Sequence, residues 1–121
     1  MASTITSATL KVTITEEVLL NGRDQGSINE FSIGSVNEIY KRIVTVPTSE
    51  IEIIKMDTAA GAGQFIEGDV RYIRITNKDD TNNVFLTFKN EDNDEFSVLL
   101  DYGQSFIYNS NLDGGVVNTF D

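Results

Sequence analysis

Four strand-like runs in the second half of this chain constrain its fold more than any other feature. They cover residues 70–77, 84–89, 96–101 and 104–109, and clusters rich in Asn, Asp and Gly lie between them. β-branched and aromatic residues favour strands, whereas Asn, Asp and Gly favour turns. Because no helical period interrupts this order, the second half is predicted to form a C-terminal β-meander of four strands.

The first half carries four more runs of the same kind, at residues 10–20, 28–33, 36–46 and 51–56. Ile, Val and Thr together occupy 35 positions, against 14 for Leu, Ala and Met. That ratio favours strands, because β-branched side chains suit a pleated surface. Eight strands at spacings of roughly ten residues predict an all-β fold, an eight-stranded antiparallel β-sandwich that is jelly-roll-like.

Charged, turn-forming and glycine residues are expected to mark the ends of the first strands of the chain. Residues 10–20 alternate in hydrophobicity except at Glu16-Glu17, which marks either a bend or a charged strand edge. Asn21-Gly22 and then residues 24–26 supply turn chemistry, in a loop predicted to be longer than a two-residue hairpin. Gly34 is predicted to end one strand before the next begins.

The sandwich domain is predicted to span residues 10–111, between an N-terminal arm at 1–9 and a C-terminal tail at 112–121. The arm is uncharged and rich in Ser and Thr. It is either a frayed terminus or a strand that adds to a neighbour's sheet edge. In the second case its strand-favouring residues would lie at a partner interface: Thr4, Ile5 and Thr6.

The composition lacks the side chains that most catalytic sites and transition-metal sites use. The chain has no Cys and no His, so it lacks thiolate and imidazole ligands and the commonest general base. No apolar run approaches the roughly 20 residues of a membrane span, and residues 1–9 lack the features of a secretory signal. We therefore expect a non-enzymatic protein without a cofactor, which starts near Met1 and is made in a reducing cytoplasm.

Charge is distributed unevenly along the chain. The formal net charge is −10, and residues 79–121 carry nine acidic groups against one basic group, Lys89. Such a field repels phosphates and anionic lipids, so neither nucleic acid nor a membrane is an expected partner. The acidic part is either a solvated face that aids solubility, or a face kept away from neighbours or turned to a basic partner.

Two acidic loops carry the only metal-like chemistry. A frame that begins at Asn90 superficially matches an EF-hand loop, with Asp92 and Asp94 at its third and fifth positions. It lacks the turn glycine and the flanking helices, so a solvated hairpin loop is predicted. The alternative is a weak Ca²⁺ site where neighbouring loops converge, formed from some of these residues: Asp79, Asp80, Asp92 and Asp94.

Aromatic residues gather in the second half, and most are expected in the core or in cross-strand pairs. Phe85 is out of phase with Val84 and Leu86, so either a second sheet buries it or an apolar face meets another subunit. Arg71 and Arg74 are predicted on opposite faces of one strand. At least one of these two arginines is therefore expected at an interface or beside a charged partner.

Three phrases of the sequence resemble small virion proteins of tailed bacteriophages, marine ones especially. They are GDVRYIRITN at 68–77, DTNNVFLTF at 80–88 and LDYGQSF at 100–106. The resemblance implies a structural part of the particle, located in the virion after synthesis in the host cytoplasm. Its partners would be the major capsid protein or other virion subunits, and we also expect a homo-oligomer.

We therefore expect a capsid decoration (cement) protein that binds the outer shell of a tailed phage. In this hypothesis the less charged N-terminal half binds the shell, and the acidic loops face solvent. The runner-up is a tail or fibre adaptor protein. A carbohydrate-binding module is the alternative from a different class, and an exposed pair of Tyr side chains in a groove would favour it.

Overall fold

The structure, a computed structural model, describes residues 6–57, 64–66, 69–90 and 92–109. These residues contain ten strands and no helix, which confirms the all-β prediction. The chain divides into two compact units, Met1–Val44 and Thr45–Asp121. The first unit contains β1 (Ala8–Thr15), β2 (Leu19–Leu20), β3 (Arg23–Asp24) and β4 (Ile28–Val36). The second unit contains β5 (Lys55–Asp57), β6 (Gln64–Ile66), β7 (Tyr72–Thr76), β8 (Val84–Lys89), β9 (Glu95–Leu100) and β10 (Ser105–Asn109).

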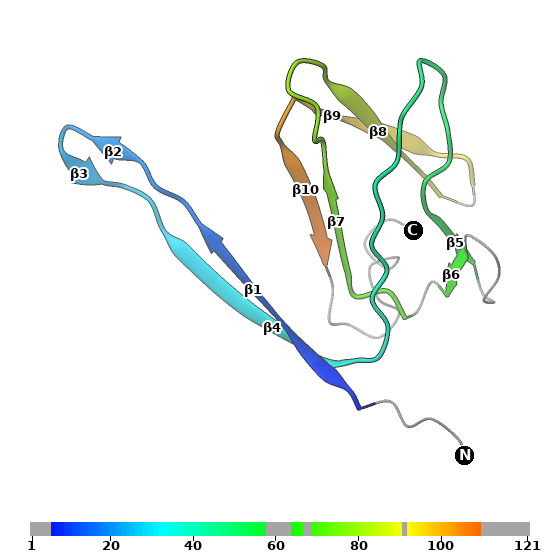
Figure 1. The fold of residues 1–121 in the computed structure, drawn as a ribbon, viewed down its shortest axis with the longest axis horizontal. Coiled ribbons are helices and arrows are strands. Elements are labelled where there is room, and N and C mark those ends of the chain that lie inside the picture. The colour runs from blue at the N-terminus through cyan, green and yellow to red at the C-terminus, as the bar shows by residue number, and fades with distance from the viewer. Residues whose placement is uncertain (1–5, 58–63, 67–68, 91, 110–121) are drawn as a thin grey trace. The chain divides into compact units, whose positions relative to one another are not determined.

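The strands of the first unit form one long antiparallel ribbon. β1 pairs with β4, and β2 and β3 continue the ribbon to its tip (Figure 1). Glu16 and Glu17 lie in the gap between β1 and β2. The prediction that Gly34 ends a strand is wrong, because β4 passes through it. The irregularity lies at Ser35, whose φ is 57°, opposite a register shift between Ala8 and Leu10, as in a β-bulge.

The tip of the ribbon is a two-residue turn. Asn21 and Gly22 have φ values of 53° and 77°, and Leu20 pairs directly with Arg23. Positive φ at both central residues is what a type I′ hairpin turn requires, and Asn-Gly adopts it at little cost. The longer loop that the sequence predicted is therefore wrong.

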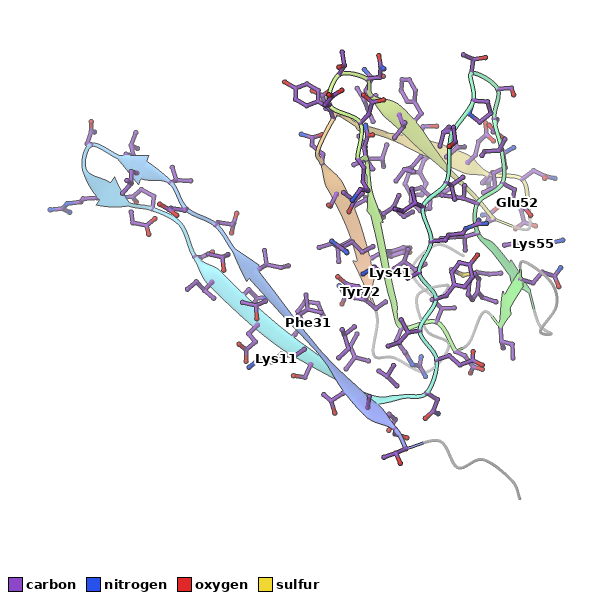
Figure 2. All side chains as sticks on the ribbon, viewed as in Figure 1. Lys11, Phe31, Lys41, Glu52, Lys55 and Tyr72 are labelled. Atoms are coloured by element: carbon purple, nitrogen blue, oxygen red, sulfur yellow. The ribbon has the colours of Figure 1, made fainter. Side chains whose placement is uncertain are left out.

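The ribbon has one apolar face and one polar face. On the apolar face Leu10 lies opposite Ile33, and Phe31 lies two residues before Ile33 along β4. On the polar face, Lys11 forms an ion pair with Glu30 at an Nζ–Oε1 distance of 3.4 Å. Figure 2 shows Lys11 and Phe31 on opposite sides of the ribbon. This arrangement follows from the alternation of the sequence, because successive side chains of a strand point to opposite faces.

The predicted strand at 36–46 is wrong beyond its first residue. β4 ends at Val36, and among the described residues 37–54 enter no strand pairing. β-branched and aromatic residues give this stretch strand propensity, but a strand also needs a partner edge, and no described strand supplies one. The predicted strand at 51–56 is reduced to β5, which pairs with β6 in parallel, so the sheets are not all antiparallel.

The predicted meander is also wrong. β7 pairs with β10 and β8 pairs with β9, so the β8–β9 hairpin is nested within the β7–β10 pair (Figure 1). Asn77 explains this topology. Its backbone N–H donates to the carbonyl oxygen of Gln104, and its carbonyl oxygen accepts from the N–H of Gly103, both at 2.9 Å. These bonds extend the pairing of β7 with β10, and residues 78–83 lead the chain into a separate sheet.

Aromatic rings join these two sheets. The Phe88 ring stacks on Phe96 with centroids 4.8 Å apart, and its centroid lies 5.1 Å from that of Phe106 and 6.3 Å from that of Tyr108. The apolar faces of β8–β9 and β7–β10 therefore contact each other, and burial raises the pKa of Tyr108. This is a two-layer arrangement of two-stranded sheets. The described strands do not form the two larger sheets of an eight-stranded sandwich.

The Asn77 side chain fixes the end of this arrangement and is 6% exposed. Its Nδ2 donates to the carbonyl oxygens of Asn82 at 2.8 Å and Leu100 at 3.2 Å. Its Oδ1 accepts from the backbone N–H of Asp79 at 3.1 Å. The three hydrogen bonds of this buried amide can form together in only one arrangement of the surrounding backbone. Asn77 therefore ties the 78–83 loop and the end of β9 to β7.

We predict that Asn77→Ala destabilises the second unit by about 2 kcal/mol, because it removes the three hydrogen bonds of a buried amide. Asn83→Ala is the matched control, since Asn83 is exposed on the same loop. Denaturant unfolding monitored by tyrosine fluorescence measures both changes. Equal stability of the two variants would contradict the role assigned to Asn77.

A second prediction concerns Gly26, below the tip of the ribbon. A Cβ added there would collide with the carbonyl oxygen of Glu16, whereas a Cβ on Gly34 would meet open space. Gly26→Ala is therefore expected to break the bond from the Glu16 N–H to the Ser27 carbonyl oxygen, which is 2.8 Å long. Hydrogen exchange at the Glu16 amide should accelerate in Gly26→Ala and not in the control Gly34→Ala. Unchanged exchange in both would show that the ribbon absorbs the clash elsewhere.

Candidate functional site

The candidate functional site is a surface, and its centre is the stretch 37–44, which we call the exposed segment. Ile39 and Ile43 are 84% and 83% exposed, the highest fractions among the large apolar side chains that the structure describes. The guanidinium carbon of Arg42 lies 5.6 Å from the centroid of the Tyr40 ring. A contact between residues two apart is that of an extended chain, in which alternate side chains share a side. Ile39, Lys41 and Ile43 therefore share the opposite side of the extended chain from Tyr40 and Arg42. The position of Lys41 can be seen in Figure 2.

Unpaired strand edges are a second feature, and each unit has them separately. Each of the five sheets in the described residues has two strands, so each strand has one edge that no other described strand covers. An uncovered edge presents a row of backbone N–H and C=O groups that can pair with another chain. Extended segments bind in this way by adding a strand to an exposed sheet edge.

The outer face of the β8–β9 sheet adds an apolar pair. Phe85 lies opposite Leu99, and these side chains are 69% and 50% exposed. Further along the same face, the hydroxyls of Thr87 and Ser97 lie 2.9 Å apart. Of the two outcomes that the sequence left open for Phe85, burial by a second sheet does not occur in the part of the chain that the structure describes. An apolar contact with another molecule remains the alternative.

The ammonium group of Lys89 is already paired with two carboxylates of its own chain. Its Nζ lies 3.3 Å from the Glu50 carboxylate and 3.5 Å from that of Glu95. The hydrogen bond and charge of Glu50, followed by the charge of Glu95, hold the pKa of Lys89 above its usual value. Because Lys89 is the sole basic residue in 79–121, this part of the sequence is an acidic surface whose one cation is already paired.

The acidic loops are organised by their own hydrogen bonds. The Asn90 Oδ1 accepts from the backbone N–H groups of Asp92 at 3.0 Å and Asp94 at 2.9 Å, and Asn93 adopts a φ of 65°. This is the hairpin loop that the sequence predicted. Within the described ranges, no three Asp or Glu residues come together in a group that could hold a metal ion. The convergence that a weak Ca²⁺ site needs is not observed there.

The structure describes three of the five interface residues expected from the sequence. Thr4 and Ile5 lie outside the described residues, and Thr6 is exposed and precedes β1. Arg71 is half-buried and lies just before β7, so it does not share a strand with Arg74 as predicted. Arg74 is exposed within β7, opposite Ile107.

Sequence reasoning missed the exposed segment as a surface. The sequence predicts a strand there from its β-branched and aromatic residues. Whether the side chains of such a stretch are buried depends on a partner strand, which the local sequence does not identify. Asn77 was missed too, although an Asn at the end of a strand, directly before a polar loop, is a typical position for a side chain that bonds the backbone.

The surface offers backbone pairing, apolar side chains and a few charges, which are the chemistry of an interface. No protein-family model matches the chain, and no curated protein or solved structure is similar to it. The described residues include no helix that is long and apolar enough to cross a membrane.

A prediction concerns Asp79, whose carboxylate organises the 78–83 loop. It accepts from the backbone N–H groups of Asn82 at 3.0 Å and Thr81 at 2.8 Å, and these bonds hold the pKa of Asp79 below its usual value of 3.8. A lowered pKa in the folded state gives stability that is present above pH 3.8 and is lost as the pH falls through the folded value. Asp79→Asn is expected to remove this contribution.

The stability difference between the wild type and Asp79→Asn should therefore shrink when denaturant unfolding is repeated below pH 3.8. Asp80→Asn on the same loop is the control for the loss of one negative charge. If the wild type and Asp79→Asn lose stability in parallel on acidification, the carboxylate of Asp79 does not carry the effect.

Proposed function

We propose that this chain is a non-enzymatic structural subunit that holds neighbouring subunits together in a larger assembly. The observation that carries the proposal is the exposure of Ile39 and Ile43 on a segment with strand propensity and no strand partner among the described residues. Burial of one large aliphatic side chain stabilises a contact by about 1.5–3 kcal/mol. Two such side chains on one extended segment favour a segment that is covered in the working state.

Unpaired strand edges support the same proposal. A free protein with uncovered edges is prone to pair with unrelated chains, and natural proteins protect such edges. In an assembly, neighbouring subunits cover the edges instead. We propose that the strand pairs are extended into larger sheets in this way, so that the two-layer sandwich predicted from the sequence is completed only in the assembly.

The charge distribution gives the subunit a direction. The unit Met1–Val44 has a net charge of −1, whereas Thr45–Asp121 has a net charge of −9. Because close approach of like charges opposes association, the nearly neutral unit is the one suited to contacts with neighbouring subunits. Acidic side chains of the second unit that stay exposed in the assembly keep it soluble.

Among assemblies, we propose the virion of a tailed phage, with the chain as a capsid decoration protein on the outer shell. The support is the resemblance of residues 68–77, 80–88 and 100–106 to small virion proteins. A shell also suits weak individual contacts, because many contacts made at once raise the overall affinity. In this proposal the partner is the major capsid protein.

A carbohydrate-binding module is the second candidate, and exposed aromatic rings favour it. Tyr102 is 55% exposed and Phe85 is more exposed still. Rings of this kind can stack on sugars, although the chain has no Trp. Binding of the purified chain to a glycan array, lost on Tyr102→Ala, would replace the structural proposal with this one.

The proposal predicts the copy number of the chain in particles produced by the genome that encodes it. A decoration protein occupies repeated positions on the shell, so quantitative mass spectrometry should find it at a copy number comparable to that of the major capsid protein. A tail or fibre adaptor would be present at the copy number of the other tail-ring proteins. Absence of the chain from purified particles would overturn the virion proposal altogether.

A further inference from the structure

We infer that two copies of this chain associate by pairing their exposed segments as antiparallel strands, related by a two-fold axis that passes near Ile39 and Tyr40. The partner is thus a second copy of the chain, and the contact is isologous. This inference goes beyond the proposed function, because association of the purified chain can be measured without any other component of a larger assembly.

The order of charges on the segment carries the inference. Glu38 comes first and is followed by Lys41 and Arg42, and all three side chains are exposed. An antiparallel arrangement about the stated axis places Glu38 of one copy opposite Lys41 or Arg42 of the other, depending on a one-residue choice of register. Symmetry produces this match twice. Opposite charges in directly opposed cross-strand positions stabilise a pair, and like charges destabilise it.

The apolar residues match in the same two registers. In one register Val36 lies opposite Ile43, and Tyr40 lies opposite Ile39. In the other, Val36 lies opposite Val44, and the two Tyr40 side chains meet on the axis. Pairs of β-branched and aromatic residues are favourable across strands. A parallel, in-register arrangement would instead place Glu38 against Glu38 and Lys41 against Lys41, so the antiparallel direction is preferred.

The electrostatics of the rest of the chain point to the same surface. Residues 37–44 carry two basic groups and one acidic group, whereas the unit Thr45–Asp121 has a net charge of −9. Two copies that approach through their acidic units repel each other. Pairing through the exposed segments instead brings complementary charges into contact.

The contact is expected to be weak in solution. It involves residues 36–44 of each copy, fewer than the roughly 20–30 residues a side of a stable interface, and a two-stranded ribbon alone is marginally stable. Association should therefore depend on protein concentration. On a surface that carries many copies, the high local concentration would favour the same pairing.

The test exchanges the charges of the segment. Glu38→Lys makes all its charged residues positive, and the double variant Lys41→Glu/Arg42→Glu makes them all negative. Sedimentation velocity over a concentration series should show a monomer–dimer equilibrium for the wild type and monomers for each variant alone. An equimolar mixture of the two variants should restore the dimer, because each copy then meets opposite charges. Circular dichroism and thermal unfolding check that both variants are folded.

Two controls separate this mechanism from general charge effects. Glu38→Lys reduces the net charge of the chain from −10 to −8, so a repulsion governed by total charge predicts stronger association, the opposite of our expectation. Glu17→Lys makes the same change outside the segment and should leave the dimer intact. A mixture that stays monomeric would overturn the inference, as would a wild type that is monomeric at every concentration.

Hydrogen exchange distinguishes the remaining arrangement, in which the segment pairs within its own chain. Pairing between copies predicts that amide protection across residues 37–44 increases with protein concentration in the wild type. Protection that is independent of concentration would show intramolecular pairing and contradict the inference. Failure of these tests leaves the virion proposal standing, since copy number in particles is measured separately.

Discussion

A strand pairing satisfies the hydrogen-bonding groups on only one edge of each strand, and every sheet among the described residues of this protein stops at two strands. The remaining structure follows from this constraint. Two-stranded sheets bury little, and only Ile33 and Leu100 are fully buried among the described apolar side chains. Such sheets are marginally stable by themselves. Stability within the chain must therefore come from contacts between sheets and from polar anchors, and the proposed function adds other molecules as a third source.

The second unit shows how the first two of these sources operate. The ring of Phe88 contacts Phe106 and Tyr108 across the gap between two sheets, so apolar burial is concentrated in one cluster. Asn77 supplies the polar anchor, because its amide bonds link a loop to the end of β9. An aromatic cluster stabilises without specifying direction, whereas a buried amide with fixed partners specifies one arrangement. Together they explain a nested pair of hairpins in place of a meander.

The third source, other molecules, connects the fold to the proposed function. The stretch around Ile39 and Ile43 has the residue composition of a strand, yet these two side chains are exposed to solvent. In the proposed function, a neighbouring chain pairs with this stretch and removes the cost of leaving it uncovered. We propose on this basis that the protein lies between subunits, where its own sheets and those of its neighbours complete each other.

The sequence alone determined the all-β class, the position of the turn at Asn21-Gly22 and the hairpin loop at Asn90, because these depend on local conformational preference. It also determined the faces of β1 and β4, since side-chain direction alternates along any strand. Which strands pair was decided only in the tertiary structure. Residues 36–46 were predicted to form a strand, but among them only Val36 pairs, and β7 pairs with β10 and not with β8. The physical reason is that hydrophobic alternation fixes the faces of a strand, whereas pairing depends on which backbone edge is available. Side chains such as Asn77 influence which edges are available, because they bond to backbone groups that are far away in the sequence.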